Sequence, residues 1–282
     1  GNTMAQITDL FIYPVKSLKG IQLTHAETSQ RGFKYDREWM ITDCDYKFIT
    51  QREKELMATI EVSISTDELI LKSNKSEFKV SLTSEKKSLV KVSVWEDTCD
   101  ANDEGDAISS WLTNELGKYN GKSLRLVRFS NQGQRTVPEE YLNGIDAESA
   151  FSDQFPYLIT TWESLTKLNN GLKEKGSQEV TMNRFRPNIV LKGLSDIEKK
   201  TSYDLVCDSS NYKFGLRKPC KRCKVTTINQ NTGKIIDPKE PLSTLVNLGF
   251  SDELYGAFFG QNAILLSNAD CVLKIGDQIK IT

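Results

Sequence analysis

The stretch of the sequence best equipped for chemistry is residues 217–224, where two thiols stand three positions apart among cationic side chains. The thiols are Cys220 and Cys223, and five Lys or Arg residues share the stretch with them. Nearby positive charge favours the thiolate, which is the form that binds a soft metal or attacks an electrophile. The same cations can hold a phosphate group. The combination favours a site for an anionic cofactor that carries a metal.

The cysteine pair by itself allows other interpretations. A zinc site needs four ligands, and the sequence has neither a second closely spaced Cys pair nor a His pair. A thioredoxin-like redox pair would open a helix, whereas residues 225–228 are β-prone and predict a strand. Two thiols without a function are the third possibility, because free Cys is often buried and inert.

Two segments in the N-terminal part carry groups suited to an anion. Lys16 and Ser17 follow the first predicted strand, in a turn whose charge and backbone N–H groups can bind an anion. Arg37 stands beside Asp36, and Arg52 follows in a second polar segment. The alternatives are a solvated basic turn for the first segment and a surface ion pair between Asp36 and Arg37 for the second.

Two further polar segments lie beyond the middle of the chain. Arg184 and Arg186 directly precede a buried-type strand, and Pro187 fixes the backbone there, so the segment suits a rigid clamp for an anion. Ser152 and Asp153 lie in an Asx-type loop that can present a carboxylate to the N–H groups of a ligand.

The single histidine, His25, restricts the catalytic options. It lies in an alternating, strand-like stretch far from any candidate nucleophile, and we interpret it as an ordinary sheet or surface residue. Catalysis by Ser-His-Asp or Cys-His groups would have to use this one residue, and a zinc site built from several His is excluded.

Composition excludes further classes of protein. The 37 basic and 38 acidic residues give a net charge of −1, which argues against a nucleic-acid or membrane-surface binder. No apolar run approaches the about 20 residues of a membrane span. Apart from the pair, the cysteines are scattered in a chain too long to need disulfides, so we expect a reduced, cytoplasmic setting.

Hydrophobic patterning predicts an α+β protein that is mainly β, with two β-rich lobes. A helix is expected where apolar residues repeat at helical spacing over 108–116, before Gly117, and another over 165–172, before Gly176. A short helix is expected at 241–248, and residues 130–150 are a predicted surface loop or connection. The predicted strands are 5–13, 21–27, 39–42, 58–64, 68–72, 77–82, 89–95, 123–129, 157–160, 188–191, 225–228, 263–266 and 271–281.

The five polar segments, in this order, resemble the MOSC (molybdenum cofactor sulfurase C-terminal) family. The resemblance is to its two-part members, which include the mitochondrial amidoxime-reducing component and its bacterial relatives. It implies a MOSC-type β-barrel with a few peripheral helices, divided into an N-terminal MOSC-type β-barrel domain over 4–130 and a MOSC domain over 131–282. The sequence differs from close relatives at Asn229 and Gln230, where they often carry Asp-Pro.

The resemblance also implies a set of site residues. Molybdenum would be held by a pterin dithiolene and by the thiolate of Cys223, the one catalytic and metal-ligating residue, with Cys220 as a neighbour. Cations and one hydroxyl would hold the phosphate and the polar edge of the pterin, and other groups would line the pterin. The first group is Lys16, Ser17, Arg37 and Arg186, and the second is Ser152, Asp153, Asn188 and the backbone of Lys221 and Arg222.

The implied activity is the reduction of N-hydroxylated compounds, such as amidoximes and hydroxylamines, by a molybdenum-molybdopterin cofactor. The sequence has no iron–sulfur cysteine cluster, haem-attachment motif or dinucleotide fingerprint, so we expect electrons from a separate flavin, iron–sulfur or cytochrome protein. The alternative is a non-catalytic carrier of the cofactor, or of sulfur as a persulfide on Cys223.

Overall fold

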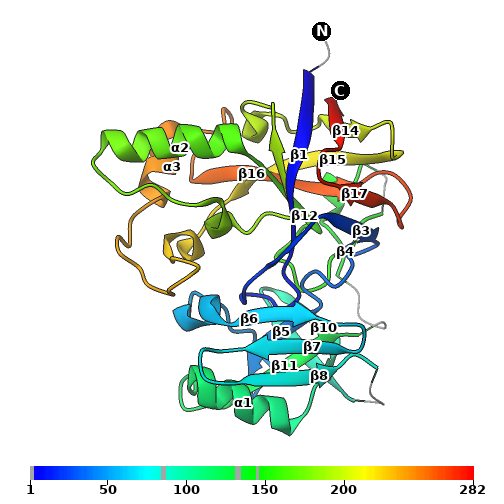
Figure 1. Ribbon diagram of the computed structural model, residues 1–282, viewed down its shortest axis with the longest axis vertical. Coiled ribbons are helices and arrows are strands. Elements are labelled where there is room, and N and C mark those ends of the chain that lie inside the picture. The colour runs from blue at the N-terminus through cyan, green and yellow to red at the C-terminus, as the bar shows by residue number, and fades with distance from the viewer. Residues whose placement is uncertain (1–2, 84–86, 131–134, 144–145) are drawn as a thin grey trace.

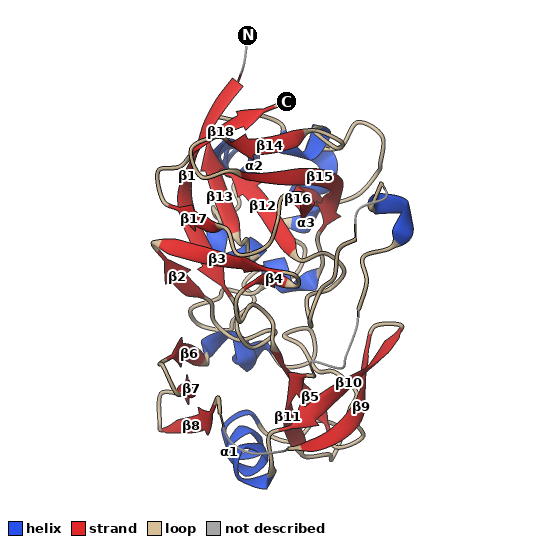
Figure 2. Ribbon diagram, turned by 90° about the vertical axis from the view of Figure 1, so that its right-hand side faces the viewer, coloured by secondary structure: helices blue, strands red, loops and turns tan. Residues whose placement is uncertain are grey.

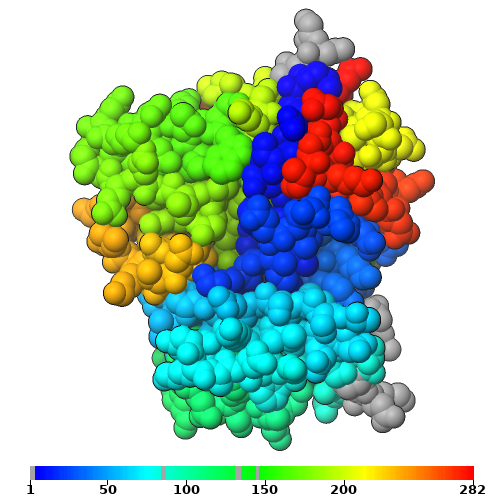
Figure 3. Space-filling view, viewed as in Figure 1, coloured from blue at the N-terminus to red at the C-terminus, as the bar shows by residue number. Residues whose placement is uncertain are grey.

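The structure is a computed structural model that describes residues 3–83, 87–130, 135–143 and 146–282. Two β-rich lobes lie one above the other along the long axis of the molecule (Figure 1). The upper lobe holds both ends of the chain, with the first and last strands side by side on the face shown in Figure 3. The mainly β, α+β architecture confirms the predicted fold class.

A barrel forms the upper lobe. Within the described part of the chain, seven strands close into a ring, because β1 (Thr3–Ile12) pairs with both β18 and β13. Every neighbouring pair is antiparallel except β12 with β13. The other six strands of the ring are β12 (Tyr157–Thr161), β13 (Ile189–Lys192), β14 (Asp204–Cys207), β15 (Tyr212–Lys221), β16 (Phe258–Leu265) and β18 (Gln278–Ile281).

Short strands and two helices surround the barrel. The helix α2 (Trp162–Glu174) begins at Thr161, whose hydroxyl accepts a hydrogen bond from Ser164 N, and it buries the leucines predicted to face the core. The helix α3 (Leu242–Leu248) packs beside it (Figure 1). The added strands are β2 (Ile21–Leu23), β3 (His25–Ser29), β4 (Gly32–Phe33) and β17 (Val272–Lys274).

The lower lobe packs one helix between two antiparallel sheets (Figure 2). The helix α1 (Asp106–Leu116) buries Ile108, Leu112 and Leu116, which share one apolar core with residues from both sheets. One sheet contains β5 (Trp39–Asp43), β11 (Leu124–Phe129), β10 (Asp97–Asp103) and β9 (Ser88–Val94), and the other contains β6 (Glu61–Ile64), β7 (Glu68–Lys72) and β8 (Glu77–Ser81).

The predicted strand over 225–228 is wrong. The 3₁₀ helix η5 (Lys224–Thr227) occupies this segment, because Cys223 O accepts hydrogen bonds from both the backbone nitrogen and the hydroxyl of Thr226. A Thr hydroxyl that bonds to the local backbone competes with strand pairing. The strands β4, β10, β14 and β15 were not predicted, because Asp, Asn, Lys and Gly interrupt their alternation.

Other predictions need adjustment or lie partly outside the described residues. The expected strands over 21–27 and 271–281 are each two strands, and residues 58–59 belong to η1 (Glu55–Thr59) rather than to a strand. Of the connection over 130–150, residues 131–134 and 144–145 lie outside the described residues. The remaining 3₁₀ helices are η2 (Glu139–Tyr141), η3 (Met182–Phe185) and η4 (Ile197–Lys199).

The position of β1 bears on how the chain divides. This strand belongs to the N-terminal part of the sequence, yet it completes the barrel built from residues beyond 156. A division between residues 130 and 131 therefore stays a prediction.

In the described residues, no helix combines the length and the apolar character needed to cross a membrane.

Candidate functional site

One cavity collects every predicted site residue. Its volume is about 140 Å³, and Thr50, Arg52 and Gln154 share in its lining. The predicted residues that line it are Lys16, Ser17, Arg37, Ser152, Asp153, Arg186, Asn188, Lys221, Arg222 and Cys223. Segments separated by as many as 207 residues, from Lys16 to Cys223, thus meet at one place.

The two thiols of the cavity face different arginines. Cys223 follows β15 at the start of η5, and its side chain is exposed, with the sulfur 3.8 Å from Nη1 of Arg52. Cys220 is half-buried, and its sulfur lies 3.0 Å from Nη1 of Arg222. Of the two, the Cys223 thiol is therefore the more accessible to solvent, as a metal ligand or a carrier thiol requires.

Two arginines lie over the ring of Tyr13. The guanidinium carbons of Arg37 and Arg186 are each 4.4 Å from the ring centroid, a cation–π distance. Arg37 also pairs with Asp36 at 2.8 Å, and that carboxylate accepts a hydrogen bond from Tyr13 N. The side chain of Asp36 is only 1% exposed, so the interpretation of this pair as a surface ion pair is wrong.

Arg186 carries a buried charge with few partners. Its backbone is left-handed, with φ of 53°, and Nη1 donates to Gln230 Oε1 at 3.3 Å. Nη2 is buried and has no hydrogen-bond partner among the described residues. Burial, and then the nearby charge of Arg37, lower the pKa of Arg186 to about 10. A buried cation with an unpartnered donor indicates that an anionic ligand belongs beside it.

Lys16 and Asp153 form an ion pair on another wall of the cavity. Lys16 Nζ lies 2.5 Å from Asp153 Oδ1 and also donates to Phe151 O, while Trp95 Nε1 donates to the same carboxylate oxygen at 2.9 Å. Burial lowers the pKa of Lys16, and the Asp153 charge opposes this shift. Although burial raises the pKa of Asp153, the charge and hydrogen bonds of its partners hold that pKa well below its usual range. Solvent screens the pair in part, since the Asp153 side chain is 63% exposed.

Arg135 positions the loop that carries Ser152 and Asp153, although the sequence prediction missed it. Its guanidinium is almost fully buried, and it donates to the carbonyl oxygens of Ala150, Ser152 and Asp153 at 2.5 to 2.9 Å. Asp97 balances its charge at 3.0 Å. The residue lies in a stretch that the sequence marks only as a polar loop, so its pattern gave no indication of this role.

Asn188 and Ser17 line the cavity, but other groups already occupy their side chains. Asn188 accepts from Leu158 N and donates to Phe11 O, so its amide joins β12 and β1. Ser17 has a left-handed backbone, with φ of 75°, and its hydroxyl accepts from Gln51 N. Both residues therefore shape the wall of the cavity, whatever they contact in a ligand.

A pair of glutamines joins two distant parts of the sequence next to Arg186. Gln51 and Gln230 exchange two buried side-chain hydrogen bonds, at 2.8 and 3.0 Å. The amide oxygen of Gln230 also accepts the bond from Arg186. The glutamine pair thus supports the wall that holds the buried arginine.

The cavity fits a ligand that combines anionic groups with a soft metal. In the part of the chain that the structure describes, three buried polar atoms of its lining have no hydrogen-bond partner, namely Ser152 Oγ, Arg186 Nη2 and Arg222 Nε. Such orphaned groups are rare in a folded protein unless a ligand or water satisfies them. The exposed thiol of Cys223 supplies a ligand that soft metals prefer.

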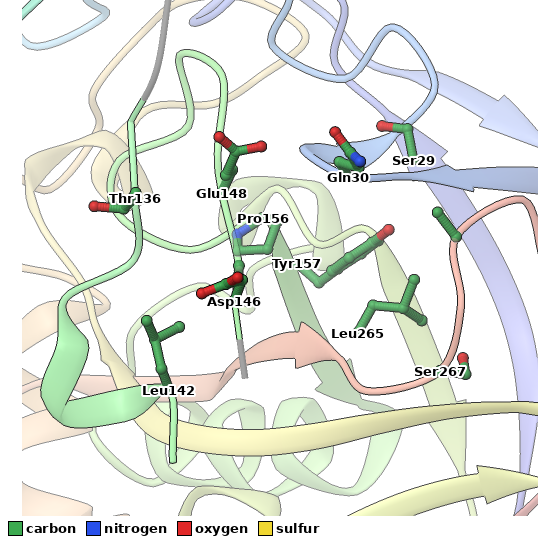
Figure 4. A pocket seen from close by; sticks show the side chains of 12 residues that line it. Ser29, Gln30, Thr136, Leu142, Asp146, Glu148, Pro156, Tyr157, Leu265 and Ser267 are labelled. Atoms are coloured by element: carbon green, nitrogen blue, oxygen red, sulfur yellow. The ribbon is translucent and has the colours of Figure 1, made fainter. Parts of the chain in front are cut away.

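A second cavity, of about 430 Å³, lies beside the end of β16 (Figure 4). Tyr157, Leu265 and Glu148 are part of its lining, and the predicted site residues are not among the described residues around it. Burial raises the pKa of Tyr157 far above its usual value. This cavity offers no thiol and no Lys or Arg among those residues, so it does not have the chemistry of the first.

The fold and the site agree with one class of protein. The model of the MOSC N-terminal beta barrel domain matches residues 4–119, and the model of the MOSC domain matches residues 146–280. The chain therefore belongs to the MOSC family, in the two-part form that the sequence resemblance predicted.

Several known proteins are similar to this chain over nearly its whole length. The chain is 30% identical to human "Mitochondrial amidoxime-reducing component 1" over 97% of its own length and 82% of that protein. It is 29% identical to bovine "Mitochondrial amidoxime reducing component 2" over the same shares of the two chains. It is 28% identical to "Molybdenum cofactor sulfurase" of Drosophila persimilis, covering 98% of this chain and 35% of that protein. The chain is thus a MOSC protein related to proteins of molybdenum-cofactor chemistry.

Proposed function

We propose that this protein is a molybdenum-cofactor-dependent reductase of N-hydroxylated compounds. The observation that carries the proposal is the meeting, in one cavity, of an exposed thiol with buried cations whose donors are partly unpartnered. The relatives named as amidoxime-reducing components support the choice of substrate.

Each part of the cavity has a role in this proposal. Cys223 would provide the thiolate ligand of the metal. Arg37, Arg186 and Lys16 would bind the phosphate and polar edge of the cofactor, and Ser17 would present its turn backbone to the same groups. Ser152, Asp153, Asn188, Lys221 and Arg222 would complete the wall along the pterin.

The overall reaction defines what the protein must supply. The N–O bond of an N-hydroxylated substrate breaks, two electrons and two protons are consumed, and the products are the amine or amidine and water. The bound molybdenum cofactor supplies the two-electron chemistry of oxygen removal. The protein binds and orients the reactants and limits the access of water to them.

The two electrons must come from another molecule. We propose a separate donor protein that carries a flavin, an iron–sulfur centre or a cytochrome haem.

All six cysteines of the chain are free thiols, which is consistent with the reduced, cytoplasmic setting proposed for this protein.

A carrier of sulfur or of the cofactor is the second candidate, and the exposure of Cys223 favours it. A persulfide on this thiol would lie beside the Arg52 guanidinium, which stabilises an anionic sulfur. The relationship to molybdenum cofactor sulfurases supports the same class of role. A carrier would hold cofactor or sulfur without turning over N-hydroxylated substrates.

A turnover assay separates the two candidates. Protein produced in a host that makes the cofactor is mixed anaerobically with N-hydroxybenzamidine and reduced methyl viologen, and benzamidine is measured by chromatography. We expect many benzamidine molecules per chain, and none when NADH is the only reductant. Absence of turnover by protein that contains molybdenum would refute the reductase and favour the carrier.

A further inference from the structure

A tryptophan at the edge of the site has an unfavourable backbone conformation. Trp95 and Glu96 form the two-residue turn between β9 and β10, since Val94 pairs with Asp97. The φ angle of Trp95 is 53°, in the left-handed region where bulky side chains are rare and Gly or Asn is usual. Residues retained in this conformation concentrate at functional sites.

The side chain of Trp95 is held in place by residues of the cavity. Its indole N–H donates to Asp153 at 2.9 Å, and the Arg52 guanidinium lies 4.3 Å from the ring centroid. The Phe48 ring is 5.2 Å away and tilted by 54°. Arg52 is also the group that lies 3.8 Å from the sulfur of Cys223. The indole is therefore separated from the reactive thiol by a single guanidinium.

Trp95 nevertheless remains 50% exposed. It lines a hollow of about 520 Å³ that adjoins the cofactor cavity, because Asp153 and Gln154 line both. A large aromatic surface that is fixed on one side and exposed on the other is suited to stacking against a flat ligand. A substrate that reaches Cys223 through this hollow would lie along the indole.

We propose that Trp95 determines substrate specificity by stacking against planar, conjugated N-hydroxylated compounds, so that N-hydroxyamidines attached to an aromatic ring are the favoured class. This inference rests on the proposed reductase function and extends it to a substrate class. Aliphatic N-hydroxyamidines offer too little flat surface to gain from the indole.

The kinetic test compares two substrates across three variants. On molybdenum-loaded protein, Trp95→Ala should lower kcat/KM for N-hydroxybenzamidine by about two- to tenfold, mainly through KM, because one aromatic contact is lost. For N-hydroxyacetamidine the change should stay below about twofold, since that substrate has no ring to stack. Trp95→Phe keeps an aromatic ring but loses the bond to Asp153, so it should keep the preference. Trp111→Phe, on α1 in the lower lobe, is the matched control.

A binding test needs no cofactor and separates this inference from the proposed function. Calorimetry with benzamidine and acetamidine on cofactor-free protein should show that Trp95→Ala weakens benzamidine alone. If the wild type reduces neither substrate, the reductase proposal fails, and the calorimetry still decides the role of Trp95. Equal losses for both ligands in either test, or the same loss in Trp95→Phe as in Trp95→Ala, would overturn the inference.

Discussion

Two buried arginines of this protein differ in what their guanidinium groups contact. Arg135 donates to three carbonyl oxygens and pairs with Asp97, so its donors are well used. Arg186 has a long bond of 3.3 Å to Gln230, and its Nη2 finds no partner within residues 3–83, 87–130, 135–143 and 146–282. A buried charge with hydrogen-bond partners is compatible with a stable fold. A buried charge without them lowers the stability of the protein until a ligand supplies the missing partners.

This contrast predicts opposite effects of the same substitution. Arg135→Met should lower stability by about 3 kcal/mol, because three carbonyl oxygens lose their donor. Arg186→Met should leave the melting temperature of cofactor-free protein unchanged or raise it by about 2–4 °C, because an uncompensated charge disappears. Thermal unfolding of both variants checks the prediction. A large fall for Arg186→Met would show that its charge is already satisfied in the protein alone.

At this scale the sequence indicated residues that line the candidate site but not the residues that support them. Arg186 and the pair Cys220 and Cys223 were singled out because their residue types, in clusters, suit an anion and a metal, and the cavity brings them together. The choice of Cys223 over Cys220 came from the family resemblance and stays a prediction. Trp95 and Arg135 were missed because their roles depend on contacts with Asp153 and its loop, which lie far along the chain. No local pattern marks a tryptophan at a hairpin turn as part of a site.

Among the elements, strand β16 contains a glycine, Gly260, at a position where the neighbouring strand β12 leaves no room for a side chain. Gly260 has φ of 79°, and a Cβ there would lie 2.9 Å from both Ile159 O and Thr160 Cγ2 of β12. Its backbone nitrogen donates to the buried carboxylate of Glu198. Gly176, after α2, has a similar φ of 75°, but no heavy atom of the described residues lies within 4 Å of the position of a Cβ.

Alanine substitutions at the two glycines therefore separate two costs in stability, that of steric crowding and that of a left-handed backbone. Gly176→Ala should cost about 1 kcal/mol, the strain of a left-handed conformation. Gly260→Ala should cost about 2–4 kcal/mol, because β12 must also move away from the new methyl group. Urea unfolding of both variants gives the difference. Equal costs would mean that the barrel absorbs the methyl group freely.

Elements with strong periodicity were predicted well and those shaped by local polar contacts were not. The leucines of α2 are buried as their spacing indicated. The segment after Cys223 curls into η5 instead of a strand, because the Thr226 hydroxyl bonds to Cys223 O. That curl sets the direction in which the chain leaves Cys223, so the missed element is the one closest to the proposed chemistry.

In the whole molecule, the first strand of the chain closes a barrel that is otherwise built from its second half. Without β1, the edges of β13 and β18 would lack their partner. An open edge of this kind exposes unpaired backbone groups and promotes aggregation. The resemblance to a two-part family suggested a division at residue 130, and the path of β1 could not be derived from strand propensity alone.

A fragment experiment tests how far the barrel depends on this strand. Residues 131–282 alone should fail to unfold cooperatively, as followed by circular dichroism. Joining residues 3–33 to this fragment through a flexible linker should restore a cooperative transition, since β1 then closes the ring. A cooperative transition in the bare fragment, with the midpoint of the joined form, would show that β1 is dispensable.

The central claim is that the cavity around Cys223 binds a molybdenum cofactor and that the Cys223 thiolate holds the metal. Its most direct test is the molybdenum and pterin content of wild type, Cys223→Ser and Cys220→Ser, produced side by side in a host that makes the cofactor. We expect about one molybdenum and one pterin per chain in the wild type and in Cys220→Ser, and loss of the metal in Cys223→Ser, because a single exposed thiolate is the proposed protein ligand. Neither molybdenum nor pterin in the wild type, or equal loss in the two cysteine variants, would contradict the account.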